Sequence, residues 1–516
     1  MIAAVRNLVL RMTGGDDSIA NRCADLLREL ADGHVCTPIA PADCDRMAAV
    51  PGLLANLGED DPEPGAVRTL FVARRGLLYT RRNWLYERTL RHYLRALPPA
   101  QPLEATATFP DTPFYQSLRP EQRTAVLTLA ANRFTILTGG PGTGKTHTLA
   151  RAVAWIREQQ PTLRLGLAAP TGKAAARMTE AMAGALQGGG APKATTLHTL
   201  LGSTANGVTF RHNRENPLPL DWLIVDEASM IDLPLMAKLL DALPESCRLT
   251  LVGDVDQLAS VERGRVLGDL CRLPGISLCR LRQSTRFPAA GEIARLAEAV
   301  NTGNPEAALD LLATPTELLH YHDLAGLSPF QPAQWPDFFA RLRQGFAAFA
   351  AARTPEEALA HLNDCRLLCA LRHGPYGYEQ LNETVKALLG LSAPQPVMIT
   401  QNDHALGVAN GDVGVVMPSE PDRLYLPGAA GPRAIRRAFL PATEMAYATT
   451  VHKSQGSEFT DVLILLPPTA DSPLLTREIL YTAITRTKRA VHLYAGAPAI
   501  RRCCLKRIER LSGLDA

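Results

Sequence analysis

The segment FTILTGGPGTGKTHTLARAVAWI, residues 134–156, constrains the fold most, because a glycine-rich loop joins an apolar strand-like run directly to a helical run. The loop carries the spacing G-x-x-x-x-G-K-T from Gly139 to Thr146. Glycines let backbone N–H groups approach an anion, and the helix N-terminus adds a partial positive charge. The order strand, loop, helix predicts a phosphate-binding loop in which Lys145 reaches the β- and γ-phosphates and Thr146 holds Mg²⁺. Alone, the loop predicts an NTPase of unspecified kind.

The rarity of lysine adds weight to Lys145. Of 54 lysines and arginines, only eight are lysines. Arginine does not replace a compact ammonium at a tight phosphate site, so each lysine that remains is a candidate for such a role.

Short apolar runs alternate with helical stretches in two parts of the chain, which predicts two parallel sheets in an α/β fold. The first set is FTIL, RLGLAA, WLIVDEA and RLTLVGD, between about 114 and 275; the second is RLLCAL, DVLILL and AVHLYA, between 366 and 495. A Gly/Pro-rich segment at 392–441, with a turn at Asn410-Gly411, interrupts the second set. It predicts a small inserted β-barrel.

The segment LIVDEASM, residues 223–230, ends a hydrophobic strand with two carboxylates. Asp226 at the strand end is suited to the Mg²⁺ shell, and Glu227 is suited to activate a water as general base. The alternative is that the pair caps the helix expected near Leu233. Asp232 fits that capping position better, so the catalytic interpretation is favoured.

Further polar clusters follow other predicted strands, where ligands of doubly wound sheets bind. They lie in APTGKAAARM (169–178), TTLHTLLG (195–202), LVGDVDQLASVERGRVLGDL (251–270) and LRQSTRF (281–287). Another polar cluster, TTVHKSQGSEF (449–459), directly precedes the strand predicted at 462–466. So many clusters indicate an extended site, larger than a nucleotide pocket.

In this order the motifs resemble those of superfamily 1 DNA helicases, and more narrowly the RecD family, the alpha subunit of exodeoxyribonuclease V. LLCALRHGPYGYEQLN (367–382), PVMITQNDHALGVANGDVGVV (396–416) and GHVCTPI (33–39) are also similar to that family. The resemblance implies two RecA-like P-loop motor domains with ATP and Mg²⁺ between them. The expected parts are a small N-terminal partner-docking domain (1–105), a first motor domain (106–275), a second motor domain (276–391 and 442–516) and an SH3-like barrel (392–441).

The resemblance also implies residue roles. Gln122 would recognise adenine, Gln257 would sense the γ-phosphate, and Arg286 and Arg486 would reach the γ-phosphate from the second motor domain. With Lys145 and Glu227, the last three form the expected catalytic set, and Thr146 and Asp226 are the expected metal ligands. The expected nucleotide-binding set is Gln122, Gly139, Gly140, Pro141, Gly142, Thr143, Gly144, Lys145, Thr146, His147, Gln257, Arg286, Gly456, Glu458 and Arg486, with Glu458 near the ribose.

The DNA contacts that the resemblance implies are Thr171, Lys173, Thr196, His198, Thr450 and His452. Such side chains contact phosphates and sugars without reading sequence. Lys453 fits either the DNA or the nucleotide side. The hairpin at Asn206-Gly207 is equally consistent with a strand-separating pin and with an ordinary surface turn.

The function implied is an ATP-dependent 5′→3′ DNA helicase subunit of a RecBCD-like complex in double-strand-break repair and recombination. Its expected partners are single-stranded DNA, duplex ends, and RecB-like and RecC-like subunits in a heterotrimer. A D…(D/E)-x-K nuclease pattern is not evident, so a partner is expected to cut DNA. Alternatives are a stand-alone RecD-like or conjugative-type helicase, a P-loop ATPase that never moves along DNA, and a structural subunit with a vestigial motor.

Composition limits the kind of DNA site, the role of the cysteines and the cellular location that we expect. A formal net charge of +3 excludes a strongly basic overall field, so a DNA site must be a local channel. The ten cysteines form no C-x-x-C pair, which favours free thiols over a metal cluster. No apolar run approaches the roughly 20 residues that span a bilayer, and no signal peptide is expected, so a cytoplasmic protein without membrane partners is predicted. Arginines on and just before the helix predicted at 83–97 are expected to cover a solvated face or the acidic face of a partner, and the solvated face is favoured for each: Arg81, Arg82, Arg88, Arg91 and Arg95.

Overall fold

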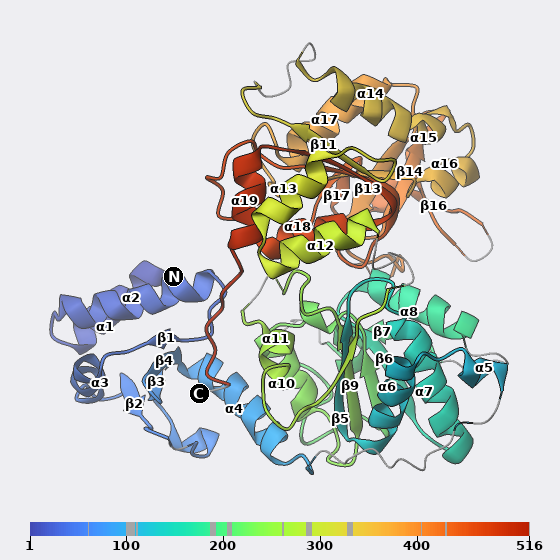
Figure 1. Cartoon of the computed structure of the whole chain (residues 1–516). Helices are drawn as coiled ribbons and strands as arrows, with labels where there is room; N and C mark the ends of the chain where they lie inside the picture. The colour runs from blue at the N-terminus through green and yellow to red at the C-terminus, as the bar shows by residue number, and fades with distance from the viewer. Residues whose placement is uncertain are drawn as a thin grey trace.

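The computed structural model describes residues 1–59, 61–99, 109, 112–185, 192–203, 209–260, 263–284, 291–327, 334–403, 405–428 and 431–514. Arg286 and the Asn206-Gly207 hairpin lie outside these residues. The described chain forms an N-terminal unit, two α/β units and a small antiparallel sheet (Figure 1).

The first α/β unit is built on a six-stranded sheet with the order β10-β5-β9-β8-β6-β7, in which every neighbouring pair is parallel. The strands are β5 (Phe134–Gly139), β6 (Leu165–Ala169), β7 (Thr195–Thr196), β8 (Trp222–Val225), β9 (Arg248–Gly253) and β10 (Ser277–Leu281). Its main helices are α6 (Pro120–Ala131), α7 (Lys145–Gln159), α8 (Gly172–Ala185), α9 (Leu197–Leu201), α10 (Leu233–Asp241) and α11 (Val266–Leu270). The predicted parallel sheet is confirmed.

Strand β10 corrects the expected boundary between residues 275 and 276. It pairs in parallel with β5, from Ser277 opposite Thr135 to Leu281 opposite Gly139. This pairing buries Cys279 and Leu281 in the core beneath the glycine-rich loop. The first sheet therefore extends to Leu281.

The second α/β unit has a five-stranded parallel sheet with the order β11-β20-β19-β12-β18. The strands are β11 (Leu319–Asp323), β12 (Cys365–Cys369), β18 (Ala448–Thr450), β19 (Phe459–Leu465) and β20 (Thr487–Ala495). Two hydrophobic clusters cover its faces, one built with α12 (Glu292–Thr302), α13 (Pro305–Ala313), α18 (Arg477–Ile484) and α19 (Ala497–Leu505), the other with α14 (Pro336–Gly345), α15 (Ala347–Ala351), α16 (Pro355–His361) and α17 (Tyr378–Leu389). Burial on both faces explains the continuous apolar run VLIL, residues 462–465, in the C-terminal part of β19.

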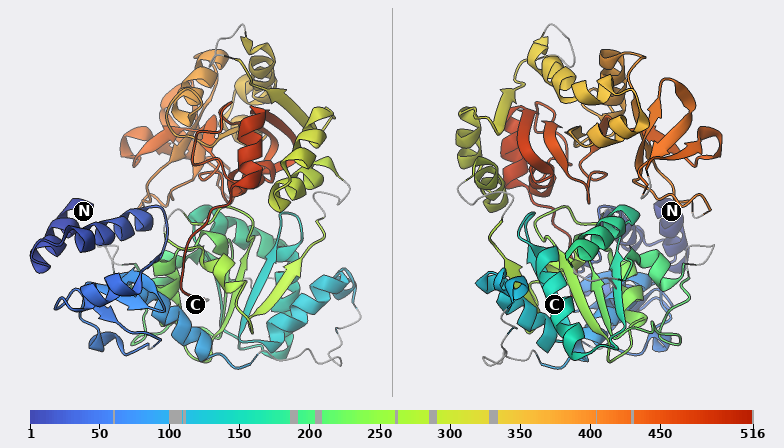
Figure 2. Two further views of the ribbon diagram at one scale, coloured as in Figure 1. Left: turned by 60° about the vertical axis from the view of Figure 1, so that its left-hand side comes forward. Right: turned by 90° about the vertical axis from the view of Figure 1, so that its right-hand side faces the viewer.

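The inserted segment forms a five-stranded antiparallel sheet with the order β16-β15-β14-β13-β17, at the edge of the second unit (Figure 2). Its strands are β13 (Gln395–Ile399), β14 (Val413–Met417), β15 (Glu420–Leu426), β16 (Arg433–Arg436) and β17 (Thr443–Met445). Because β17 pairs with β13, the sheet continues past the expected end at residue 441. The SH3-like barrel remains a prediction.

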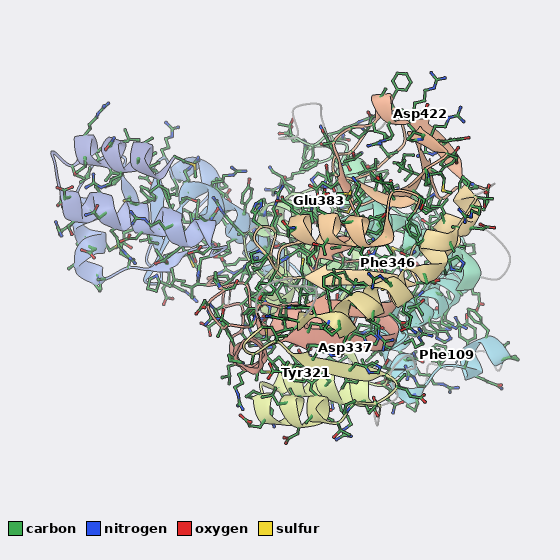
Figure 3. All side chains as sticks on the ribbon, turned by 90° about the horizontal axis from the view of Figure 1, so that it is seen from above. Phe109, Tyr321, Asp337, Phe346, Glu383 and Asp422 are labelled. Atoms are coloured by element: carbon green, nitrogen blue, oxygen red, sulfur yellow. The ribbon has the colours of Figure 1, made fainter. Side chains whose placement is uncertain are left out.

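The N-terminal unit projects to one side of the two α/β units (Figure 3). It holds α1 (Ile2–Met12), α2 (Asp17–Ala31), α3 (Pro41–Ala48), α4 (Arg81–Arg95), and a sheet of β1 (Thr37–Pro38), β4 (Leu77–Thr80), β3 (Phe71–Arg74) and β2 (Leu54–Asn56). Trp84 and Leu90 of α4 share one hydrophobic core with Leu233 and Met236 of α10. The N-terminal unit and the first α/β unit are therefore packed together as one body.

One expectation for α4 is wrong. Arg91 does not lie on a solvated face but is 5% exposed. It forms ion pairs with Asp61, at 2.9 Å, and with Glu87, at 3.0 Å. Pairing with two carboxylates offsets the cost of burying the guanidinium.

The end of the chain also departs from its expected place in the second motor domain. Residues 506–514 leave α19 and run down to the N-terminal unit, where the C-terminus lies beside α4 (Figure 1). Leu514 is buried in the core that the N-terminal unit shares with the first α/β unit. In the described part of the chain, no helix has the length and apolar character needed to cross a membrane.

Candidate nucleotide site and nucleic-acid interface

The glycine-rich loop connects β5 to α7, as its sequence predicts. Gly142 and Gly144 have φ angles of 74° and 85°, in the left-handed region that favours glycine. A Cβ on Gly144 would also lie 2.6 Å from Nε2 of Gln122, so a larger residue would strain the backbone and displace that side chain. The Lys145 ammonium donates to the carbonyls of Gly139, at 2.6 Å, and Gly140, at 3.1 Å. The loop is thus curled around its own lysine at the start of α7.

Asp226 and Glu227 follow β8, on the same edge of the sheet as the loop. Oδ1 of Asp226 accepts a hydrogen bond from the Glu227 N–H at 2.8 Å. Glu227 has a φ of 51°, a strained conformation for a non-glycine residue that is typical of functional sites. Burial, reinforced by the charge of Glu227, raises the pKa of Asp226 to about 6. Helix α10 is capped by Asp232, which accepts from the Leu235 N–H at 2.7 Å, so the two carboxylates are not needed as caps.

A cavity of about 270 Å³ lies between the two α/β units and gathers most of the predicted nucleotide-binding residues. Its lining includes Pro141, Gly142, Thr143, Gly144, Lys145, Thr146, His147, Asp226, Glu227 and Gln257 from the first unit and Gly456, Glu458 and Arg486 from the second. The structure thus brings together segments that are more than 300 positions apart in the sequence. Cationic Lys145 and Arg486 face the same space as the carboxylates, an arrangement suited to a nucleotide triphosphate with a divalent cation.

Arg486 is 3% exposed and lies in the turn that follows α18. Its Nε donates to the Thr482 carbonyl and its Nη1 donates to the Ser457 carbonyl, both at 3.3 Å. Burial lowers the pKa of this guanidinium. These bonds fix Arg486 at the wall of the cavity opposite Lys145.

Hydrogen bonds join the two units beside this cavity. The Tyr481 hydroxyl donates to Oδ2 of Asp254 at 3.1 Å, and that same oxygen accepts from Nε2 of Gln257 at 3.1 Å. The Leu258 N–H donates to Oγ1 of Thr482 at 3.0 Å, and Nε2 of Gln455 donates to the Leu258 carbonyl at 2.8 Å. The predicted sensor Gln257 therefore lies within the contact between the units.

Some predicted residues do not line this cavity. Gln122 lies behind the glycine-rich loop, where its Oε1 accepts from the Arg119 N–H at 3.1 Å and its Nε2 donates to the Thr143 carbonyl at 3.3 Å. Gly139 and Gly140 contribute the carbonyls that hold Lys145. Their roles toward a nucleotide stay predictions.

Sequence reasoning missed Arg177 as a site residue, although it lines the cavity. Arg177 lies within α8 and forms an ion pair with Glu458 across the cleft. The polar candidates that the sequence indicates in its segment, APTGKAAARM, are Thr171, Gly172 and Lys173. Burial raises the pKa of Asp254 to about 6. Asp254 follows β9 directly and lines the cavity with Gln257, as the position of both residues after a predicted strand indicates.

A second cavity, of about 300 Å³, collects most of the predicted DNA contacts. It is lined by Thr171, Lys173, Thr196 and His198 from the first unit and by His452, Lys453 and Gln455 from the second. Four residues of the inserted segment also line it: Met398, Asn402, Asn410 and Gly411. A trough with hydroxyl, imidazole, amide and ammonium groups suits a sugar-phosphate backbone.

Thr450 does not line either cavity. Its Oγ1 accepts from the Lys453 N–H at 3.3 Å, so it holds the turn that carries His452. Lys453 lies on the second cavity but is paired with Glu444, and its ammonium lies 4.6 Å from the centre of the Tyr378 ring. Lys173 donates to Oγ of Ser457 at 2.7 Å, and burial lowers its pKa to about 8.

Comparisons with known proteins show which families and proteins the chain is similar to. The AAA domain family matches residues 122–263, and the UvrD-like helicase C-terminal domain family matches residues 445–494. The RecBCD enzyme subunit RecD of Mycobacterium tuberculosis (strain H37Rv) is 39% identical, over 97% of this chain and 91% of that protein. The ATP-dependent RecD2 DNA helicase of Deinococcus radiodurans is 33% identical, over 84% of this chain and 57% of that protein. A solved structure of two coordinating Pif1 helicases at forked duplex DNA covers 73% of this chain and 92% of that one, with 16% identity and a TM-score of 0.43.

Proposed function

Since the chain belongs to the RecD family of DNA helicases, we propose that it is the ATP-driven 5′→3′ motor subunit of a RecBCD-like complex that repairs double-strand breaks. The observation that supports this most is the cavity that both α/β units close. Lys145 and Glu227 stand on one side of it, and Glu458 and Arg486 stand on the other. A site shared by two units changes shape when they move, which a motor requires.

The donor set fits ATP and Mg²⁺. Bound ATP would supply the phosphoanhydride bond that is hydrolysed, and bound Mg²⁺ would neutralise negative charge on the phosphates. Lys145 and the glycine-rich loop would hold the phosphates, and Thr146 and Asp226 would hold the cation. In the described residues no group of three or more His, Cys, Asp or Glu could hold a metal by itself, which agrees with a cation held partly by phosphate and water.

Glu227 would accept a proton from the attacking water. Arg486, with Arg286, would stabilise negative charge that develops on the transferred phosphoryl group. Gln257 would report the state of the nucleotide to Asp254 and Tyr481, because these side chains already form one hydrogen-bonded chain across the cleft.

Single-stranded DNA would lie in the second cavity, against Thr171, Lys173, Thr196, His198 and His452. Gln455 supports a coupling between the two cavities, because it lines the second and donates to Leu258, one residue after Gln257. Opening and closing of the nucleotide cleft would thus move the loop that contacts DNA.

The N-terminal unit would dock a RecB-like or RecC-like subunit. It projects away from the rest of the chain (Figure 3) and carries exposed apolar side chains at Leu8, 45% exposed, and Leu70, 41% exposed. We also propose that the sheet of the inserted segment forms an SH3-like barrel.

Unwinding by the purified chain tests the motor proposal. A duplex with a 5′ single-stranded tail is expected to be unwound in an ATP-dependent way, and a duplex with a 3′ tail is not. Equal unwinding of both substrates would contradict the proposed direction.

Affinity purification from native cells tests the complex. Two co-purifying chains, one carrying a nuclease motif, are expected. Strong processive unwinding by a chain that purifies alone would favour a stand-alone helicase, although the chain spans only 57% of the RecD2 relative.

A further inference from the structure

The C-terminal segment, residues 506–514, crosses from one α/β unit to the other. Its first half is fastened to α18 of the second unit. The Arg477 N–H donates to the Lys506 carbonyl at 2.8 Å, and the Ile508 N–H donates to Oε2 of Glu478 at 3.1 Å. Both bonds involve the main chain of the segment, and the Glu478 side chain that accepts the second is 2% exposed.

The second half is fastened to the opposite body. Nη1 of Arg510 donates to the carbonyls of Ser260, at 2.7 Å, and Gly264, at 2.8 Å. Leu511 exchanges two hydrogen bonds with the N-terminal unit, donating to Nδ1 of His34 at 3.0 Å and accepting from the Val35 N–H at 2.9 Å.

The last described residues extend this attachment. The Gly513 N–H donates to Oε1 of the buried Glu87 at 2.8 Å. Leu514 is 8% exposed, in one core with Tyr79 and Trp84. A Cβ on Gly513 would lie 1.8 Å from the Tyr79 hydroxyl, so the tail fits this site only with glycine at that position.

Arg510 lies where three parts of the chain meet. A Cβ on Gly33 of the N-terminal unit would lie 2.6 Å from Nε of Arg510, and Gly33 has a φ of +94°. Ser260, which Arg510 binds, is three residues after Gln257. Burial lowers the pKa of His452, and the positive charge of Arg510 lowers it further, so the guanidinium also acts on the predicted DNA loop.

The short span between the two attachments limits movement. Only Glu509 separates Ile508, held by the second unit, from Arg510, held by the first. Two residues span at most about 7 Å when fully extended. The N-terminal unit and the first α/β unit share one core, so the segment ties the second unit to a single body. A wide opening of the nucleotide cleft would have to break the bonds of Arg510 or Ile508.

We propose that residues 506–514 form a strap that limits opening of the nucleotide cleft, and that Arg510 is its positioning residue, which holds the backbone after Gln257 in place for closure. The proposal rests on the proposed motor function. Arg510 needs no contact with nucleotide or DNA in this role. Loss of the strap would populate open conformers that bind ATP poorly, and the apparent affinity falls with the fraction of competent molecules.

The test is ATP turnover by the full-length chain at saturating single-stranded DNA, with ATP titrated. Arg510→Ala is expected to raise KM for ATP five- to tenfold and to change kcat less than twofold, because saturating ATP closes the cleft. Arg510→Lys should show an intermediate KM, since an ammonium lacks the fork that reaches two carbonyls. Arg501→Ala is the matched control, because Arg501 pairs with Glu306 inside the second unit, and its KM should stay unchanged.

Gly513→Ala tests the far end of the strap without touching either cavity. Like Arg510→Ala, it should raise KM for ATP. If Arg510→Ala does not fold, Gly513→Ala alone tests whether the strap limits opening of the cleft. A folded Arg510→Ala or Gly513→Ala protein with parental KM, or with a lower kcat and parental KM, would overturn the strap. A parental chain whose turnover ignores single-stranded DNA would instead overturn the motor function on which the strap depends.

Discussion

Replacement of Arg486 tests whether the second α/β unit contributes a catalytic group to the shared cavity. Two of its five N–H donors bond to the carbonyls of Thr482 and Ser457, which fix the guanidinium at the cavity wall and leave donors for a phosphate. Arginines supplied across a cleft contribute about 10³–10⁵ in rate in other NTPases. Arg486→Ala should therefore lower kcat on the order of 10³-fold, which corresponds to about 4 kcal/mol of transition-state stabilisation. Arg486→Lys should lose roughly 10²-fold or more, because a point charge does not reproduce the fork.

The assay is steady-state ATP hydrolysis at saturating single-stranded DNA, with ADP binding measured separately by fluorescence. Loss of kcat with nearly parental ADP affinity is expected, since the charge that Arg486 meets develops in the transition state. Arg489→Ala is the matched control. Arg489 is three residues away, its side chain is 64% exposed and it pairs with Asp461, so its loss should change kcat less than twofold. Turnover by Arg486→Ala within threefold of the parent would refute the reasoning.

Three further predictions concern the same region. Glu227→Gln should bind ATP but lose on the order of 10²–10⁴ in kcat, as expected for a lost general base, measured by single-turnover hydrolysis. Gln455→Leu removes a 2.8 Å bond to the Leu258 carbonyl and leaves it buried without that donor, so the stimulation of ATP turnover by single-stranded DNA should fall about five- to 100-fold. Burial raises the pKa of Asp254 from 3.8 to about 6. Above pH 6 the buried carboxylate is ionised and lowers the free energy of unfolding. Below pH 3.8 the carboxyl group is protonated in both the folded and the unfolded chain, so it no longer lowers that free energy. Asp254→Asn should then raise Tm at pH 8 and leave it unchanged at pH 3.5; a Tm that rises equally at both pH values would contradict this cause.

The sequence predicted the elements that local physics controls. Short continuous apolar runs such as WLIV, which alternate with helical stretches, favour buried strands. The spacing of Gly139, Gly144 and Lys145 between a strand and a helix predicts a phosphate loop. Strand-end position also placed Asp226 and Gln257 at one edge of the first sheet, and the structure gathers both in the nucleotide cavity.

Contacts that depend on the packing of distant segments were not predictable in this way. Arg177 carries no local sign that it will meet Glu458, because an arginine on a helix is more often solvated. Arg91 looked like such a surface residue, yet Asp61 and Glu87 pair with it in a buried site. The strap around Arg510 has no strand or helix periodicity, so only the tertiary structure reveals where it runs.

In the proposed motor, ATP hydrolysis in the cavity shared by the two units drives movement along DNA, so bound DNA must stimulate ATP turnover. The most direct test compares the ATP turnover of the parental chain and of Lys145→Gln, each with and without single-stranded DNA. Strong stimulation of the parental chain by DNA, and loss of turnover in Lys145→Gln under both conditions, is the predicted result. Parental turnover that is indifferent to DNA, or a Lys145→Gln protein that hydrolyses ATP at the parental rate, would contradict the account.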